Sequence, residues 1–204
     1  MMKSFLIFLK WQRKLLCYIF SFLEFFTVKN TLVYRFYTKW IGNIFSDECA
    51  MANVSSNETV LHIGCGSLPT MSILVAKNAH AKVIAIDNNL RTVQHAQRYI
   101  NQQKLSDLIT IKHGDGGSYP AEIFDVIFIA INVTSIDAVF RHLASTSKPS
   151  VRIICRDLGN GVVRMLKSDE FSHIFTIRSI MKHSINNSLL IVKHKSPTHI
   201  LIRH

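Results

Sequence analysis

The chain has 204 residues, of which 48% are hydrophobic, and it carries a formal net charge of +11. This length fits one domain with a full hydrophobic core and an N-terminal extension. The four cysteines, Cys17, Cys49, Cys65 and Cys155, are scattered without a close pair. This spacing argues against a disulfide framework or a metal site and indicates a reduced, cytoplasmic protein. The positive charge indicates an anionic partner, either nucleic acid or membrane lipid.

The first segment, residues 4–26, is rich in Phe, Leu and Ile and is interrupted by Lys10, Arg13, Lys14 and Glu24. No uncharged run reaches the length of a membrane span. Arg13 and Lys14 lie between two apolar blocks, whereas a cleavable signal peptide has its basic end before a single block. At about 100° per residue the segment forms a helix with a narrow basic stripe and a wide apolar face. Such a helix binds a membrane interface or packs on protein, and both alternatives stay open.

The basic charge is concentrated in the same region. Residues 1–46 hold seven Lys and Arg against the single acid Glu24, so the charge is densest beside the most apolar part of the chain. We therefore expect residues 1–28 to contact an anionic membrane surface, and we do not expect nucleic acid as a partner. Residues 1–52 are assigned to a helical, basic and apolar extension, and residues 53–204 to the main domain.

Alternating strands and helices follow a polar link at residues 53–58. Strands are expected at 60–63, 83–86, 108–112, 124–131 and 151–155, and helices at 69–78, 90–103, 135–145 and 162–167. The run 124–131 is apolar apart from Asp125, as is typical of a central parallel strand. Residues 175–181 and 189–193 flank the turn pair Asn186 and Asn187 and predict a hairpin. The expected fold is α/β, a Rossmann-like, doubly wound, mostly parallel seven-stranded sheet that ends in an antiparallel hairpin, with an N-terminal helical extension.

A turn with two glycines follows the first strand. Residues 60–66 read Val-Leu-His-Ile-Gly-Cys-Gly, and the second strand ends in Asp87. Glycines let the backbone approach a ligand, and an acid at the end of the second strand binds the ribose of an adenosine-containing cofactor. A dinucleotide site needs a third glycine where this chain has Ser67, Leu68 and Pro69. We therefore do not expect NAD.

Gly64, Gly66 and Asp87 resemble the acid-x-Gly-x-Gly loop and the ribose-binding acid of the class I S-adenosylmethionine-dependent methyltransferases. The resemblance implies S-adenosylmethionine as the cofactor. One departure concerns the position before Ile63, which is usually acidic in the family and is His62 here, so the group that holds the methionyl ammonium is in question.

A second, narrower resemblance is carried by residues 66–70, Gly-Ser-Leu-Pro-Thr, followed by an apolar helix. This loop is similar to that of the nicotianamine synthase family. The resemblance implies the same fold and the same cofactor, with transfer of the aminocarboxypropyl group in place of methyl.

Candidate site residues follow from the strand ends and the first resemblance. Asp115 takes the family's place for an acid or amide against adenine, or it caps a turn. Asn132 lines the methyl-transfer site or caps the next helix. Arg156 binds a substrate carboxylate or phosphate, or it pairs with Asp157 or Asp169. Asn132 and Arg156 are the candidate catalytic residues, no metal ligands are expected, and the cofactor-binding set is His62, Gly64, Cys65, Gly66, Asp87, Asn88, Asp115 and Asn132.

These features together predict a cytoplasmic S-adenosylmethionine-dependent methyltransferase, peripheral at a membrane, with a small-molecule or lipid-like acceptor. Methyl transfer asks little of side chains because the sulfonium is already activated, so alignment and exclusion of water supply much of the rate. A nicotianamine-synthase-like aminocarboxypropyl transferase is the first alternative. A non-catalytic membrane-associated module that retains the fold is the second, and His62 is its main support. An oligomer is compatible with each of them.

Overall fold

The structure, a computed structural model, describes residues 44–183 and 186–194. The predicted helix at 4–26 and its predicted membrane contact lie outside these residues. Within the described ranges, no helix combines the length and the apolar character needed to cross a membrane.

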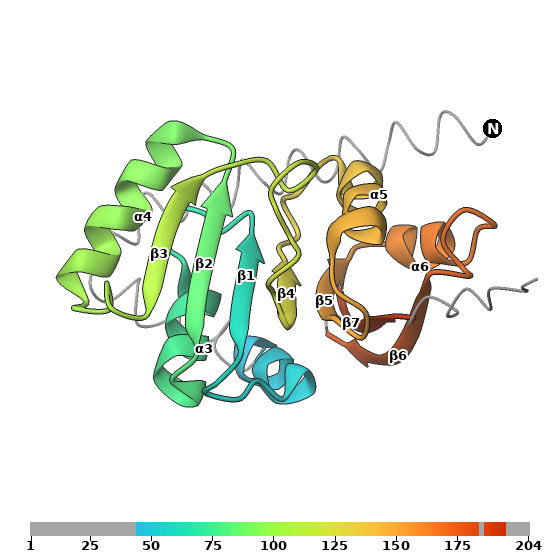
Figure 1. The fold of residues 1–204 in the computed structure, drawn as a ribbon, viewed down its shortest axis with the longest axis horizontal. Helices are drawn as coiled ribbons and strands as arrows, with labels where there is room; N and C mark the ends of the chain where they lie inside the picture. The colour runs from blue at the N-terminus through green and yellow to red at the C-terminus, as the bar shows by residue number, and fades with distance from the viewer. Residues whose placement is uncertain (1–43, 184–185, 195–204) are drawn as a thin grey trace, which may run out of the picture.

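A seven-stranded sheet forms the centre of the domain (Figure 1). Its strands are β1 (Thr59–Ile63), β2 (Lys82–Asp87), β3 (Ile109–His113), β4 (Val126–Ile129), β5 (Arg152–Asp157), β6 (Phe175–Lys182) and β7 (Asn187–Lys193). They lie in the order β3-β2-β1-β4-β5-β7-β6. The first five strands are parallel, and β7 runs antiparallel to both β5 and β6. The predicted topology is confirmed, and the strand order reverses between β1 and β4, where such sheets bind ligands.

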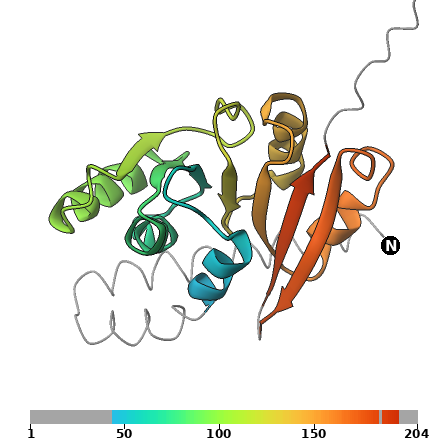
Figure 2. The same cartoon turned by 60° about the horizontal axis from the view of Figure 1, so that its bottom comes forward.

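Helices cover both faces of this sheet (Figures 1 and 2). They are α3 (Thr70–Ala79), α4 (Leu90–Gln102), α5 (Ile136–Thr146) and α6 (Gly161–Leu166), preceded by a helix over residues 44–52. The helix 44–52, α3 and α4 contribute to one buried apolar cluster, and α5 and α6 contribute to the other. Because strand side chains alternate in direction, Val60 of β1 packs into the first cluster and Leu61 into the second. The doubly wound arrangement places His62 on the same face as Val60.

The central strand β4 is buried throughout, as the apolar run predicted, but it is shorter than expected. The predicted strand began at Phe124, and the observed one begins at Val126. Asp125 directly precedes the strand, and its carboxylate binds two neighbouring groups: Oδ2 accepts from the Thr59 backbone N at 2.9 Å, and Oδ1 accepts from Lys148 Nζ at 2.6 Å.

Two further boundaries differ from the sequence-based expectation. Asn187 was predicted in the hairpin turn, but it is the first residue of β7 and pairs with Lys182. Residues 44–52 were assigned to the extension, yet Phe45 and Ala52 are buried in the same apolar cluster as α3 and α4. The helix 44–52 therefore forms part of the domain core.

Candidate functional site

The glycine loop lies at the carboxyl end of β1, beside β2. Gly64 and Gly66 have φ angles of +76° and +69°, a backbone region in which side chains are strained. The loop is pinned to β2 because the backbone N–H groups of Gly64 and Cys65 donate to the Ile86 carbonyl at 2.9 and 3.0 Å. A Cβ at Gly64 would also lie 2.8 Å from Val133 Cγ2. Gly64 is thus required both by its backbone angle and by the space around it.

Asp87 is oriented by the same loop. Its Oδ2 accepts from the Gly66 backbone N at 3.1 Å, and its Oδ1 accepts from the Asn89 backbone N at 3.0 Å. The residue is only 7% exposed, so its carboxylate has one fixed orientation. Each carboxylate oxygen has capacity for a second hydrogen bond. The arrangement can therefore accept the two hydroxyls of a ribose seated on the loop, as the sequence predicted for this acid.

Asn88 and Asp115 lie beside this acid, at the ends of β2 and β3. Asn88 is exposed, and its carbonyl accepts from His113 Nε2 at 3.0 Å, which ties the two strand ends together. Asp115 is also exposed, and its Oδ1 accepts from the Gly117 backbone N at 2.7 Å. Asp115 therefore caps a turn through its Oδ1, as one of the two alternatives predicted. Its contact with adenine stays a prediction.

Asn132 lies against the glycine loop, and Cys65 is part of that loop. Asn132 Oδ1 is 3.1 Å from the position that a Cβ of Gly64 would take. The alternative that Asn132 caps the next helix is wrong, because α5 begins at Ile136 and its N-cap residue is Ser135. Cys65 is buried, and its Sγ lies 3.6 Å from the Gly66 carbonyl O. Cys65 therefore reaches a cofactor only through its backbone.

His62 lies below the loop on the face covered by α3. It is 6% exposed, and its Nδ1 is 2.8 Å from Ser72 Oγ. Burial, reinforced by the positive charge of Arg156, lowers the pKa of His62 from 6.5 to about 3. The imidazole is consequently neutral at physiological pH. It offers no negative charge to a methionyl ammonium, and a different group has to provide it.

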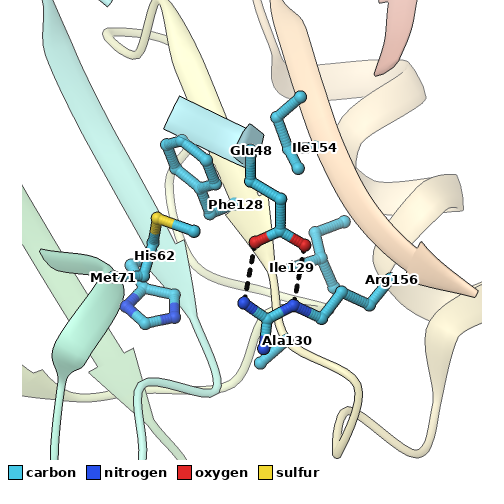
Figure 3. A pocket seen from close by; sticks show the side chains of 8 residues that line it. All are labelled: Glu48, His62, Met71, Phe128, Ile129, Ala130, Ile154 and Arg156. Atoms are coloured by element: carbon cyan, nitrogen blue, oxygen red, sulfur yellow. Dashed lines mark hydrogen bonds and ion pairs between the residues drawn. The ribbon is translucent and has the colours of Figure 1, made fainter. Parts of the chain in front are cut away.

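Arg156, a candidate catalytic residue, forms a bidentate ion pair with Glu48 of the helix 44–52 (Figure 3). Its Nε donates to Glu48 Oε1 at 2.8 Å, and its Nη2 donates to Oε2 at 2.7 Å. Ser188 Oγ donates to the same Oε1 at 2.6 Å. The predicted pairing with Asp157 or Asp169 is wrong. Asp157 instead accepts from backbone N–H groups in the first turn of α6.

Glu48 was missed by the sequence analysis, although it is 1% exposed and sits at the centre of these contacts. Its partner is 108 residues away along the chain, and no local pattern joins two such positions. The available signal was weak: Glu48 is an acid in a short apolar helix placed directly before the glycine-loop strand. Phe45, one turn earlier, lies with its ring centroid 4.2 Å from the Arg156 guanidinium carbon and covers it.

A small pocket joins these groups to the glycine loop (Figure 3). It is lined by Glu48, His62, Met71, Phe128, Ile129, Ala130, Ile154 and Arg156. Ala130 Cβ is also 3.5 Å from the position of a Cβ on Gly64, so the pocket and the loop share a wall. Among the described residues, no cluster of His, Cys, Asp and Glu has the arrangement of a metal site.

Known proteins resemble the part of the chain that carries this site. Residues 60–150 match the family model described as a methyltransferase domain. A stretch of 62 residues is 36% identical to the ribosomal protein L11 methyltransferase of Alkaliphilus metalliredigens. That match covers 30% of this chain and 19% of the relative, so the chain spans about a fifth of that protein.

Solved structures share the fold. An RNA methyltransferase from Salinibacter ruber, in complex with S-adenosyl-L-homocysteine, has a TM-score of 0.64 at 12% identity, covering 79% of this chain and 97% of that one. A mutant of the nicotianamine synthase MtNAS, in complex with S-adenosylmethionine, has a TM-score of 0.69 at 20% identity, covering 94% and 76%. Both predicted resemblances are confirmed, as a match to a methyltransferase domain over residues 60–150 and as a fold shared with these solved structures.

The first prediction concerns the loop glycines. Gly64→Ala should lower the free energy of unfolding by about 1–3 kcal/mol, since a side chain is strained at this φ, and it should abolish S-adenosylhomocysteine binding. Urea denaturation and calorimetry measure the two effects. Gly161→Ala is the control, because Gly161 has no positive φ and its Cβ would lie 3.8 Å from the nearest side-chain atom. Normal binding by a folded Gly64→Ala protein would show that the pocket is misplaced.

The second prediction concerns acid stability. The folded protein binds a proton at His62 only near pH 3, because burial lowers its pKa to about 3 from the ordinary histidine pKa of 6.5. The unfolded chain therefore holds more protons between these values, and the free energy of unfolding should fall as the pH falls from about 6.5 toward 3. His62→Asn should flatten this part of the profile in urea titrations, and the exposed His95→Asn should not. Parallel profiles for all three proteins would contradict the assignment.

Proposed function

We propose that the protein transfers the methyl group of S-adenosylmethionine to a small-molecule or lipid-like acceptor. One observation carries the proposal: the Gly66 backbone N donates to Asp87 Oδ2 at 3.1 Å. This contact sets a glycine loop and a ribose-binding carboxylate side by side at the switch point of the sheet. It lies within the residues 60–150 that match the methyltransferase domain.

The cofactor supplies an activated methyl group on its sulfonium, and the residues of the chain hold and orient the cofactor. The backbone of Gly64 and Gly66 would admit the cofactor close to β1, and Asp87 would hold its ribose end. Asp115 would contact the adenine, and Asn132 would line the reacting end. Holding both reactants in line is worth several orders of magnitude in rate without any proton transfer.

The titratable groups of the adjoining pocket are compatible with an amine acceptor. His62 is neutral and desolvated. Cys49 lies behind the pocket, with its Sγ 3.6 Å from Sδ of the lining residue Met71. Burial, together with the neighbouring Glu48, raises the pKa of Cys49 to about 12, so that thiol stays protonated. An amine attacks through a lone pair that it already carries when unprotonated, and a base is needed only for acceptors that hold a proton at the attacking atom.

The distribution of charge supports a membrane-side acceptor. The described residues hold 15 Lys and Arg against 12 Asp and Glu, so most of the net charge of +11 lies outside them. The basic and apolar residues 1–28 are the part suited to an anionic lipid surface. We infer a cytoplasmic protein that works peripherally at such a surface, with no nucleic acid as its partner.

Aminocarboxypropyl transfer is the second candidate, and one specific observation favours it. The loop Gly66–Thr70 resembles that of the nicotianamine synthases, and MtNAS aligns over 94% of this chain. The two reactions leave different products from one cofactor. Methyl transfer leaves S-adenosylhomocysteine, and aminocarboxypropyl transfer leaves methylthioadenosine. Product analysis by mass spectrometry with candidate amines therefore separates them. A protein that binds the cofactor and forms neither product would support the non-catalytic alternative.

The third prediction tests the cofactor site. Asp87→Ala should weaken S-adenosylhomocysteine binding by about 1–3 kcal/mol, which is the cost of losing charged hydrogen bonds to the ribose. Calorimetry on the folded variant measures the change, with the exposed Asp107→Ala as its control. Wild-type protein should bind S-adenosylmethionine and S-adenosylhomocysteine but not NAD. Tight NAD binding would refute the assignment, as would an unchanged affinity in a folded Asp87→Ala protein.

The fourth prediction tests the extension. The full chain should bind anionic vesicles more tightly than neutral ones, because each basic group near such a surface contributes about 1 kcal/mol. Deletion of residues 1–28 should release it from vesicles in a sedimentation assay. Cofactor affinity should stay within about tenfold, since the loop and Asp87 are retained. A full chain that does not bind vesicles, and that unfolds on deletion, would assign this segment to protein packing.

A further inference from the structure

We propose that Glu48 and Arg156 together bind the amino acid end of the cofactor's methionyl group, Glu48 taking the ammonium and Arg156 the carboxylate. The proposal rests on the proposed use of S-adenosylmethionine. It places the carboxylate that binds the ammonium on the helix 44–52, which precedes β1. The position before Ile63, which is usually acidic in the methyltransferase family that the chain resembles, is the neutral His62 here.

The location of the pair supports this role. Glu48, Arg156 and His62 line one pocket, and Ala130 is part of both that pocket and the surroundings of Gly64. Strands β2 and β4 flank β1 on opposite sides, so a cofactor that has its ribose at Asp87 of β2 and crosses the glycine loop after β1 would extend toward β4. Ala130, which follows β4, and Arg156 line the same pocket (Figure 3).

Both members of the pair retain hydrogen-bonding capacity. Arg156 uses Nε and Nη2 for Glu48, and its Nη1 has no hydrogen-bond partner among the described residues. Two N–H groups of Nη1 can therefore meet a carboxylate. Glu48 Oε2 accepts one hydrogen bond, from Arg156, and has capacity for a second from an ammonium. Each end of an amino acid thus has a group of complementary charge in this pair, and the surrounding side chains have to move apart to admit it, because the free volume of the pocket is only about 10 Å³.

The energetics of the pair also favour a binding role over a stabilising one. The side chains of Arg156 and Glu48 are 16% and 1% exposed, so both lose hydration on folding. Replacing such a pair by apolar side chains is often neutral or stabilising. Its contacts nevertheless fix both groups, because Ser188 binds the carboxylate and the Phe45 ring covers the guanidinium. A desolvated pair with unused hydrogen-bonding capacity offers both of the charges that a zwitterion needs.

The fifth prediction uses two ligands that differ only at this end. Methylthioadenosine has the adenosine and sulfur of S-adenosylhomocysteine but lacks the aminocarboxypropyl group. In calorimetry with the full chain, Glu48→Gln and Arg156→Lys should each weaken S-adenosylhomocysteine binding at least tenfold. Methylthioadenosine affinity should stay within twofold. Thermal melts establish that each variant is folded.

A matched pair on the same strand provides the control. Arg152, at the other end of β5, pairs with Glu58 at 2.6 Å, away from the pocket. Glu58→Gln and Arg152→Lys should leave the affinities for both ligands unchanged. Equal losses for the two ligands in the Glu48 and Arg156 variants would overturn the proposal, because a general distortion of the site does not select the methionyl end.

An amino acid acceptor carries the same two charges and is distinguished by a further titration. Glutamate and methionine are added to wild-type protein saturated with S-adenosylhomocysteine. If either binds, and if the two variants lose that binding while S-adenosylhomocysteine affinity is unchanged, the pocket serves the acceptor and the proposal is overturned. Failure of the proposed function looks different, since the wild-type chain would then bind neither S-adenosylhomocysteine nor methylthioadenosine.

Discussion

The hydrogen bond from the Gly66 backbone N to Asp87 Oδ2, at 3.1 Å, is the contact on which the site depends. It requires β1 and β2 to be parallel neighbours, so that both strands present their carboxyl ends at one edge. It also requires Gly66 in the left-handed region, because this backbone geometry turns the amide toward the acid. Any change that moves the register of β1 against β2 separates the loop from the carboxylate, and the cofactor site is lost with it.

The hydrophobic periodicity and the turn residues of the sequence predicted most of the strands and helices that carry the site. They could do so because each of these patterns involves residues that are close together in the chain. Apolar runs of strand length alternate with helices, and the two-glycine turn and Asp87 lie on consecutive elements. The Glu48–Arg156 pair could not be predicted in this way, since the two residues are 108 positions apart and meet only when the sheet forms. The predicted helix cap at Asn132 failed for a related reason: residues 130–135 form a loop against Gly64 before α5 begins.

Two Arg–Glu pairs on β5 show how location decides what an ion pair does. Arg152 and Glu58 are 27% and 20% exposed, where water screens the interaction and a pair contributes roughly 0–1 kcal/mol to stability. Arg156 and Glu48 are nearly enclosed, where desolvation offsets much of the attraction. The Arg152–Glu58 pair connects the segment before β1 to strand β5. The Arg156–Glu48 pair holds the helix 44–52 over the ends of β4 and β5, at the wall that the pocket shares with the glycine loop.

The choice between methyl and aminocarboxypropyl transfer is made at the sulfonium, which carries three carbon substituents. On the proposed binding mode, Asp87 would hold the ribose and the Glu48–Arg156 pair would hold the methionyl end, so the sulfonium would be fixed from both sides. The second of these contacts depends on how the helix 44–52 packs on β5, because Glu48 belongs to the helix and Arg156 to the strand. The proposed mode therefore makes the covering helix, together with the glycine loop, a determinant of which substituent faces the acceptor.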